Sequence, residues 1–504
     1  MANNPSHVHA TTVQVARQSA YGTHGGSEWH ALQPTTIAGG LAALERAVHD
    51  PIDASNQYQA GSVVGLTADV PISQGLTYAA ARIFLPAAMR TAWGGPRALV
   101  DTATRPTSAT SAHFVVPTMA SALPQNTLIK VSGCATAANN GIKVVSSGGT
   151  TTQIPCSGLT AETFTAAQNV TIEVCGYQFA SGDLTVTVSG STITLGTTTK
   201  DLTDLALVSG QSIWVGDTSN AAYSYATAAV GGPARLTAAP TANAMTVDST
   251  FTTWTTDNGS SKTIRVYFGQ TARVVARASG SYSEGYYTVE HLISSLGTGN
   301  AARYQYTTDA AVNTFTLAAP AAALATLEVS LMGRDVESTD TRKANASTPT
   351  LAKLSTAYNT TADISGRLKL SSDGTALTGF ITSATITIEN GAQANPAHGV
   401  LGSAVTSYGK VRVRVSLEAF LTEHALITAA RNNYAVSANV WLRNGDGAIV
   451  LDIPEGRVST DAIGFTAGRV VTISGTVEAN ADTTWSTSLI ASLIPGCPAL
   501  IARA

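Results

Sequence analysis

The fold is decided by residues 377–430, LTGFITSATITIENGAQANPAHGVLGSAVTSYGKVRVRVSLEAFLTEHALITAA. In the first part of this stretch, Ile386 and Ile388 fall on one face and Thr387 falls on the other. In the second part, three valines alternate with a row of basic residues, which is Lys410, Arg412 and Arg414. Alternation with a period of two is typical of half-buried strands, so the stretch predicts two β-strands separated by a long loop.

A short helix is expected directly after the second strand. Thr422 can cap it, and Glu423 places an acidic group in its first turn. The same order of strand, loop, strand and helix occurs at residues 35–93, where Pro86 is expected to kink or split the helix. A hairpin and a closing strand follow each copy, in the second copy through an Asn-Gly-Asp-Gly turn at residues 444–447. We therefore predict a duplicated β domain.

The first copy is interrupted by a long segment that is rich in Thr, Ser, Ala and Gly. Two runs of short strands joined by Gly/Asn turns resemble each other there, one from Asn126 and one from Gln211. We expect one small inserted β domain or a pair of them. The expected divisions are residues 1–98 as an N-terminal arm and the first part of domain 1, 99–267 as the insert, 268–342 as the rest of domain 1, and 343–504 as domain 2. A polar segment at residues 337–353 is the expected linker.

The composition favours a self-associating β protein. Of the 504 residues, 12% are charged and 44% are hydrophobic, and 44 are glycines. So few charges leave little repulsion between chains. The net charge of −3 argues against a general nucleic-acid binder, which usually carries a basic excess. There is no signal-like N-terminus, and no apolar run reaches the roughly 18 residues of a membrane span, so we expect cytoplasmic synthesis and no membrane insertion.

The cysteines are too few for a disulfide scaffold. All four lie far apart without a C-x-x-C pair, which also argues against structural zinc. We expect reduced, mostly buried thiols. The alternative is one disulfide that joins Cys175 to Cys134 or to Cys156.

Enzymatic signatures are absent from the sequence. It contains no G-x-S-x-G, H-E-x-x-H, Walker or EF-hand motif, so no catalytic residue, cofactor or metal is expected. Trp214 and Trp254 can stack on sugars, but the core of a small β domain is the simpler interpretation. The basic row can track a polyanion. The structural alternative is a solvated or subunit-facing strand face that pairs with Glu389, Glu418 or Asp452.

Several segments resemble the tail tube proteins of long-tailed phages. The similarity lies in Asp373–Asn390, in Val411–Ala430, and in Val440–Val458 with its NGDG turn. Thr314–Asp335 is similar to the closing strands of that family's first half, and Ala16–Glu45 fits its N-terminal arm. The resemblance covers most of residues 10–98 and 270–490. The insert at residues 99–267 departs in size from the plain family.

The resemblance implies a mainly β fold with two tandem tail-tube domains. Each is a β-sandwich or barrel with a flanking helix, and the inserted small β domain is expected on the tube exterior. Two tube domains in one chain imply a homotrimeric ring with pseudo-sixfold symmetry, whose closure removes exposed strand edges. The implied partners are further copies of the chain, the tape-measure protein, the tail terminator and tip proteins, and phage DNA that passes without specific binding.

The resemblance and the sequence together suggest contact residues. A basic lumen would hold phosphates, so the row of Lys410, Arg412 and Arg414 is expected at a subunit contact or outside the tube. The N-terminal arm, with Tyr21, His24 and Trp29, and the linker are the expected ring-to-ring contacts.

Two other classes compete with this hypothesis. A cell-surface β-sandwich adhesin, with carbohydrate binding through the insert, predicts export and independent modules, for which the sequence offers no signal. A hydrolase requires paired carboxylates in a cleft, and no pattern singles out such a pair.

Overall fold

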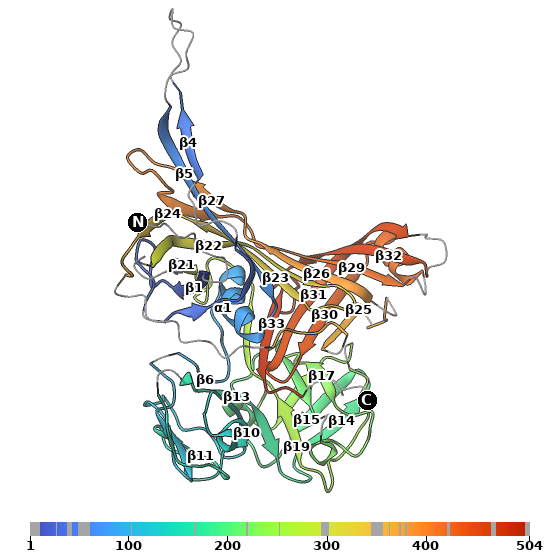
Figure 1. The fold of residues 1–504 in the computed structure, drawn as a ribbon. Coiled ribbons are helices and arrows are strands. Elements are labelled where there is room, and N and C mark those ends of the chain that lie inside the picture. Colours follow the sequence, from blue (N-terminus) through green and yellow to red (C-terminus); the bar gives the residue numbers. More distant parts are fainter. Residues whose placement is uncertain are drawn as a thin grey trace, which may run out of the picture.

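The computed structural model describes residues 11–37, 43–48, 61–293, 302–343 and 356–498, apart from short gaps at residues 27, 102, 166–167, 218–219, 251, 362, 372–373, 378–380, 421–423 and 465–469. The protein is mainly β, as the sequence predicts. Figure 1 shows a body of long strands, a hairpin arm that projects from one end of the body, and a β-rich insert at the opposite end. We use "insert" for residues 99–267 and "body" for the elements before and after it.

A seventeen-stranded sheet system forms the body, together with α1 (Tyr78–Met89) and α2 (Ala425–Arg431). The strands of its first half are β1 (Thr11–Arg17), β2 (His30–Ala31), β3 (Pro34–Ile37), β4 (Ala43–Ala47), β5 (Ser62–Gly75), β20 (Gln270–Arg273), β21 (Tyr286–Ile293), β22 (Arg303–Ala319), β23 (Thr326–Gly333) and β24 (Asp335–Thr339). The strands of its second half are β25 (Ile364–Leu370), β26 (Ile381–Glu389), β29 (Arg412–Phe420), β30 (Ala435–Arg443), β31 (Gly447–Gly464), β32 (Thr472–Asn480) and β33 (Ile490–Pro495). A separate hairpin consists of β27 (Ala392–Asn395) and β28 (Val405–Tyr408).

The stretch that decides the fold contains its predicted elements in the predicted order: β26, β29 and α2. Two details differ from the prediction. The second strand begins at Arg412, so Lys410 lies in the loop before it. The N-cap of α2 is His424, which makes no side-chain capping bond, while Thr422 and Glu423 lie outside the described residues.

Three other parts of the body differ from the sequence prediction. Residues 11–17 were expected in a polar arm, but they form β1, whose middle is buried because β21 pairs with it along its full length. The strands expected near residues 304–307 and 314–317 are one continuous strand, β22. The predicted linker begins within β24, a polar strand that pairs with β22.

Helix α1 runs through Pro86 without a break, so the proline does not split the helix. Thr77 caps the helix by accepting a hydrogen bond from the amide of Ala80. Pro86 lacks the amide that would bond to the carbonyl of Arg82 four residues earlier. The indole Nε1 of Trp93 donates to that carbonyl instead, at 2.9 Å. The lost helical bond is therefore replaced from outside the helix, which removes much of the cost of the proline.

Three sheets form the insert. The largest contains β6 (Ala98–Leu99), β9 (Thr127–Ser132), β10 (Gly141–Val144), β13 (Thr171–Phe179), β16 (Ser212–Val215), β17 (Gly232–Arg235) and β19 (Ile264–Tyr267). The second contains β7 (Ser108–Ala109), β8 (His113–Val115), β11 (Gln153–Pro155) and β12 (Glu162–Thr163), and the third contains β14 (Thr185–Ser189), β15 (Thr192–Gly196) and β18 (Ala244–Val247). Short 3-10 turns lie at Ala137–Asn139, Leu202–Leu205 and Ala221–Tyr223.

The two similar runs of strands expected inside the insert form the two halves of its largest sheet. The strand order is β10-β9-β13-β19-β16-β17, so the strands of the first run, β9, β10 and β13, mirror those of the second, β16, β17 and β19. The two runs meet where β13 pairs with β19. Gly176 lies at this pairing, where a Cβ would stand 2.3 Å from the carbonyl oxygen of Val266, so only glycine fits.

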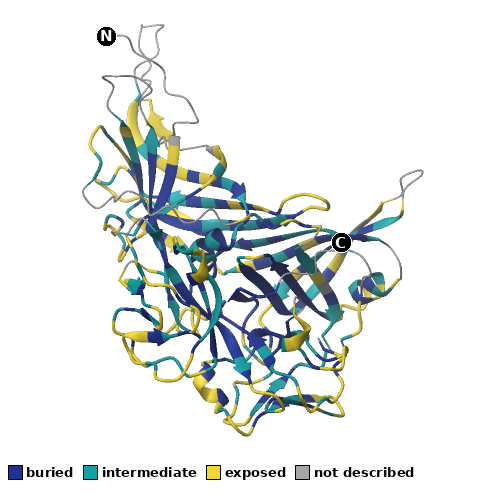
Figure 2. Cartoon of the chain, turned by 60° about the horizontal axis from the view of Figure 1, so that its bottom comes forward, coloured by how far each residue is buried: buried dark blue, intermediate teal, exposed yellow. Residues whose placement is uncertain are grey.

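Separate hydrophobic cores lie in the body and in the insert. The body core draws on both halves of the body, for example Phe84 and Leu442, whereas the insert core includes Phe114 and Phe179. Figure 2 shows buried segments running along the strands of the body, while the arm formed by β4 and β5 is largely exposed toward its tip. The chain enters and leaves the insert side by side, because Gly94 and Thr271 exchange two backbone hydrogen bonds of 2.8 and 2.9 Å.

Candidate assembly surfaces

The two halves of the body use the same strand pairing. The pairs of the first half are β1·β21, β3·β5, β5·β23, β21·β22, β22·β23 and β22·β24. The corresponding pairs of the second half are β25·β30, β26·β29, β29·β32, β30·β31, β31·β32 and β31·β33. A helix follows β5 in the first half and β29 in the second. The halves therefore repeat one topology.

The register of the strands repeats as well. The pairing of β21 with β22 shifts after Tyr287, and that of β30 with β31 shifts after Val436. β1 and β25 each have seven residues and pair along their full length. We call two residues equivalent when they hold the same place in these paired registers.

The halves join edge to edge at what we call the junction, the pairing of β22 with β26. Residues 314–319 of β22 pair there with residues 384–389 of β26. The same part of β22 pairs with β23 on its opposite edge. Leu317 and Ile388 at the junction are almost completely buried. The junction thus makes one continuous sheet from two similar halves.

Arg90 clamps the first half onto the second. It follows α1 in a left-handed conformation with φ 53°. Its guanidinium donates to the side chain of Asn390 at 3.1 Å, to the Asn390 carbonyl at 2.5 Å and to the Gly409 carbonyl at 2.9 Å. It also lies 4.6 Å from the ring centre of Tyr408. A guanidinium has the fork of donors that this multiple contact requires.

Two residues of the basic row, Arg412 and Arg414, form ion pairs with acids of neighbouring strands. Arg412 lies 2.5 Å from a carboxylate oxygen of Glu478, and Arg414 lies 3.3 Å from the same oxygen and 3.6 Å from Glu389. Glu389 was one of the predicted partners, whereas Glu478 was not. The row keeps much of its surface exposed, including Lys410 in the preceding loop. Exposed ion pairs of this kind contribute little to stability, so the row remains available for a contact.

The three residues predicted as contacts in the N-terminal segment pack within the chain. Tyr21 reaches the second half, where its hydroxyl donates to the Ser403 carbonyl at 3.2 Å. His24 lies with its ring centre 5.1 Å from that of Tyr306. Trp29 has 0% exposure beside Tyr306, so it has no surface left for another chain. We therefore keep Tyr21 and His24, both partly exposed, as candidate contacts and drop Trp29.

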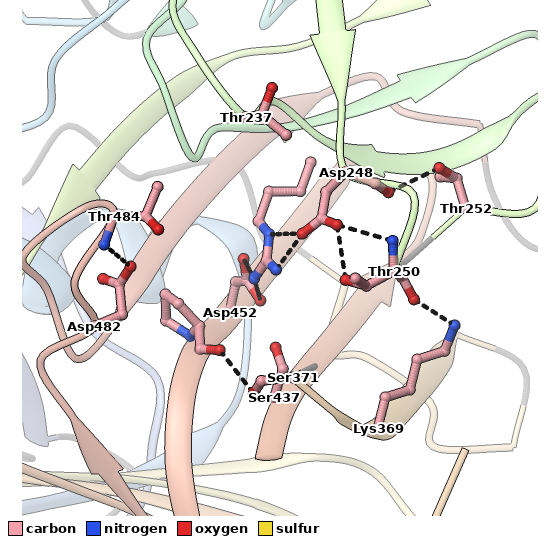
Figure 3. A network of polar contacts seen from close by, with 12 residues as sticks. Thr237, Asp248, Thr250, Thr252, Lys369, Ser371, Ser437, Asp452, Asp482 and Thr484 are labelled. Atoms are coloured by element: carbon pink, nitrogen blue, oxygen red, sulfur yellow. Dashed lines mark hydrogen bonds and ion pairs between the residues drawn. The ribbon is translucent and has the colours of Figure 1, made fainter. Parts of the chain in front are cut away.

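A buried ion network fixes the insert to the body. Arg235, at the end of β17, donates to both carboxylate oxygens of Asp452 in β31, at 3.2 and 3.0 Å. It also donates to Asp248 of the insert at 3.2 and 2.5 Å. Asp452 has 0% exposure. Figure 3 shows Asp248 and Asp452 facing the same point between the insert and the body.

The two carboxylates of this network differ in their acidity. Burial raises the pKa of Asp452, although the Arg235 guanidinium acts in the opposite direction. Burial also opposes the ionisation of Asp248, but Arg235 and Thr250 hold its pKa below the ordinary value. Both charges of a buried ion pair have lost their water, so each depends on the other. Removal of one partner alone therefore lowers the stability of the fold much more than replacement of both by apolar side chains.

An apolar cluster lies beside the ion network. It joins residues of the insert to residues of the body, namely Leu128, Cys175, Trp214 and Tyr267 with Trp441, Ala448, Val450, Ile494 and Cys497. The Arg443 guanidinium stacks 3.8 Å from the ring centre of Trp214. Trp254 is 7% exposed and lies in the insert core, as predicted, whereas Trp214, 5% exposed, is buried in this cluster between the insert and the body. All four cysteines are buried and none of them forms a disulfide, so the alternative disulfides are wrong.

A family model described as a phage tail tube protein matches residues 176–483, which is more than half of the chain. The chain belongs to the phage tail tube protein family. It is therefore a structural component of a phage tail. No curated protein matches it. The matched region begins in β13 of the insert and ends just after β32, so it contains the junction and the second half of the body except its last strand, β33.

This tail tube chain exposes apolar side chains on its projecting arm. All five residues of β4 are exposed, and the arm carries Leu44, Val48, Val63 and Val64 with 38–59% of their surface accessible. The hairpin of β27 and β28 in the second half also exposes two apolar side chains. Leu401 lies in the loop between the two strands, and Val405 begins β28. Exposed apolar side chains that gather at a projecting hairpin are typical of contact surfaces.

The tail tube chain also has an apolar pocket of roughly 440 Å³ next to the junction. The turn after β22 (residues 319–322) forms one wall, and Leu368, Leu417 and Val440 form another. None of its described lining residues is charged. Its few polar side chains are Thr and Ser hydroxyls, which gives it no acid–base pair for catalysis.

The described part of the chain offers no metal centre and no membrane helix. No group of three or more His, Cys, Asp or Glu residues in it could hold a metal ion. None of the described helices is long and apolar enough to cross a membrane. Arg90 joins the two halves of the body, and Arg235 joins the insert to the body. The sequence did not reveal either role, because the partners of these residues lie 300 and 217 residues away.

Proposed function

We propose that the chain is a major tail tube protein in which each chain supplies two of the six units of a ring. Three chains would then form a homotrimeric ring with pseudo-sixfold symmetry. The observation that carries this proposal is the repeated strand pairing of the two body halves. A closed ring also gives every strand edge a partner, which a chain with so few charges requires to avoid open-ended aggregation.

We propose the predicted division into a first tube domain, an insert and a second tube domain for this ring. The junction would be one of the unit-to-unit contacts, already present within the chain. The separate core of the insert supports its placement on the tube exterior, away from the unit-to-unit contacts. The exposed arm of β4 and β5, with its apolar side chains, is then a candidate for contacts between stacked rings.

Stacked rings would enclose the tape-measure protein and later conduct the DNA, between terminator and tip proteins. A lumen through which DNA slides has to lack a basic excess, because phosphates bind clusters of Lys and Arg. The basic row of Lys410, Arg412 and Arg414 is therefore assigned to a subunit contact or the outer surface. The acids beside it, Glu389 and Glu478, reduce its attraction for phosphates.

Negative-stain electron microscopy with mass photometry on the purified protein tests the proposal. We expect rings or tubes with three chains per ring. Six chains per ring would retain the tube and refute the pseudo-hexamer. A protein that stays monomeric at all concentrations would refute self-assembly of the isolated chain.

A further inference from the structure

A polar pocket of roughly 240 Å³ lies between the first half of the body and the insert. Its described lining includes three cationic and two acidic side chains. They are Arg82 of α1 and Asp446 from the body, and Arg105, Lys130 of β9 and Glu173 of β13 from the insert. The space is far larger than one water molecule needs, so it can take a small ion.

The contact between insert and body does not itself require charges at this place. Lys130 and Trp214 each lie one residue before the last pair of their hairpin, in the first and second run of the insert. Their partners across the sheet are Glu173 and Tyr267. Trp214 and Tyr267 are buried in the apolar cluster against the body. The first run thus has an ionic pair where the second run has an apolar contact.

The two acids of the pocket already have partners. Glu173 forms an ion pair with Arg82 and accepts a hydrogen bond from the Tyr78 hydroxyl at 3.4 Å. Asp446 accepts a hydrogen bond from the backbone amide of Thr356 at 2.9 Å. Arg82 therefore has its own counter-ion, while neither acid lies within ion-pair distance of the other two cations.

Those other cations are balanced less completely. Lys130 donates to the Gly445 carbonyl at 3.1 Å and forms no ion pair among the described residues. Arg105 lies 3.3 Å from Glu28, yet burial lowers its pKa, against the opposing effects of Glu28 and Asp101. Burial disfavours a cation whose charge is incompletely balanced. An anion in the pocket would supply the missing charge.

His30 lies in the same positive potential. This residue of β2 lines the pocket and makes no side-chain hydrogen bond within the described part of the chain. Burial lowers its pKa, and Arg105 and Arg82 act in the same direction, while Asp101 opposes them. The neutral imidazole still has one N–H group that can donate to an anion.

We propose that this pocket binds inorganic phosphate, which joins the insert to the first half of the body. Lys130 and Arg105 of the insert would supply the positive charge, and His30 of the body would donate a hydrogen bond. Charged donors of these kinds bind phosphate oxygens strongly. The anion would link the first run to the body by charge, as the buried ion network of Arg235 and Asp452 links the second run.

Isothermal titration calorimetry of the full chain with inorganic phosphate, at constant ionic strength and pH 7, tests the site. We expect one phosphate per chain with a Kd at or below about 1 mM, and Lys130→Met should weaken it at least about tenfold. Lys143→Met is the matched control, because Lys143 lies on the neighbouring strand β10 and donates to the Ala138 carbonyl, outside the pocket. It removes the same charge and should bind phosphate as the wild type does.

Arg82 is kept in this test, because its loss would leave Glu173 without a cation. Circular dichroism of both lysine variants checks that the fold is retained. Equal weakening by the two variants would overturn the site, because it would show general attraction of phosphate to positive charge.

Hydrogen–deuterium exchange gives a second readout that does not depend on a variant. Phosphate should slow the exchange of amides at residues 28–31 and 103–105 of the wild type by at least about threefold. Residues 212–215 of the second run should not change, because the apolar cluster already covers Trp214. Absence of binding heat and unchanged exchange at about 20 mM phosphate would overturn the proposal.

Discussion

Thr35 and Thr382 make the same hydrogen bond in the two halves of the body. Each is the unpaired residue of a β-bulge and donates its hydroxyl to a carbonyl of the neighbouring strand. The acceptors are Ser73 at 3.1 Å and Glu418 at 3.0 Å. Bulges are retained within families because they direct the course of a strand. Their recurrence with the same capping hydroxyl supports the origin of both halves from one unit.

We predict that Arg90→Ala destabilises the contact between the halves. The change leaves the buried backbone carbonyl and side-chain oxygen of Asn390, and the Gly409 carbonyl, without their donor, so the free energy of unfolding should fall by about 3 kcal/mol. Urea-induced unfolding followed by circular dichroism measures it. Arg277→Ala is the control, because Arg277 is 75% exposed and should change stability by less than about 0.5 kcal/mol. A similar loss for both variants would contradict the clamp.

The buried pair of Arg235 and Asp452 should behave non-additively. Arg235→Met leaves the buried Asp452 without its cation, which we expect to cost about 3–5 kcal/mol of unfolding free energy. The double variant Arg235→Met/Asp452→Leu replaces the pair by apolar side chains and should recover most of that loss. The same unfolding measurement applies to the wild type and the three variants of a double-mutant cycle. If the double variant lost as much as the sum of the single ones, coupling would be refuted.

A rescue experiment can test how α1 tolerates Pro86. Trp93→Phe removes the donor to the Arg82 carbonyl and should lower the unfolding free energy by about 1–2 kcal/mol. Pro86→Ala restores the amide that reaches this carbonyl, so in the Trp93→Phe background it should recover part of the loss. Pro86→Ala in the wild type serves as the reference for helix propensity. Equal effects of Pro86→Ala in both backgrounds would argue against the replacement bond.

His291 should make stability depend on pH. Burial lowers its pKa from the ordinary value of 6.5, so the folded side chain stays neutral where the unfolded one takes up a proton. The unfolded state therefore binds more protons below pH 6.5, and stability falls as the pH falls. We expect His291→Gln to reduce the slope between pH 6.5 and 5.5 by about 1 kcal/mol per pH unit. The exposed His398, changed to Gln, is the control, and an unchanged slope for His291→Gln would refute this account.

Reversal of the basic row tests its assignment to a subunit contact. The triple variant of Lys410→Glu, Arg412→Glu and Arg414→Glu changes exposed ion pairs that add little to the fold, so the monomer should keep its circular dichroism spectrum. Ring formation measured by mass photometry should be lost. Rings of normal mass would instead place the row on the outer surface of the tube.

The sequence predicted the elements whose signal is local. In residues 377–430 the alternation of apolar and polar residues is set by one buried face, so β26 and β29 could be found without the structure. The turn at residues 444–447 was equally clear, and it joins β30 to β31. The repeat inside the insert was visible because its strands end in Gly/Asn turns. In each case the physical cause lies within a few residues.

The parts that could not be predicted depend on distant partners. Asp452 was expected beside the basic row, but it binds Arg235, and no spacing in the sequence signals a pair 217 residues apart. The helix continues through Pro86 because Trp93 supplies the hydrogen-bond donor that the proline lacks. β1 was hidden in a polar-looking segment because β21, almost 280 residues later, determines which of its side chains are buried.

Because the backbones of Gly94 and Thr271 are paired, the insert is a segment that could be exchanged as a unit. Its two ends meet at one point, so a segment of different length or fold could take its place without stretching the body. Such an exchange is constrained elsewhere, because Trp441, Val450 and Ile494 of the body are covered by the insert. A replacement segment would need an apolar surface that covers these body residues and a cationic side chain that pairs with Asp452. A related chain with a different insert would therefore have to keep this small contact area of the body, whatever the rest of its insert looked like.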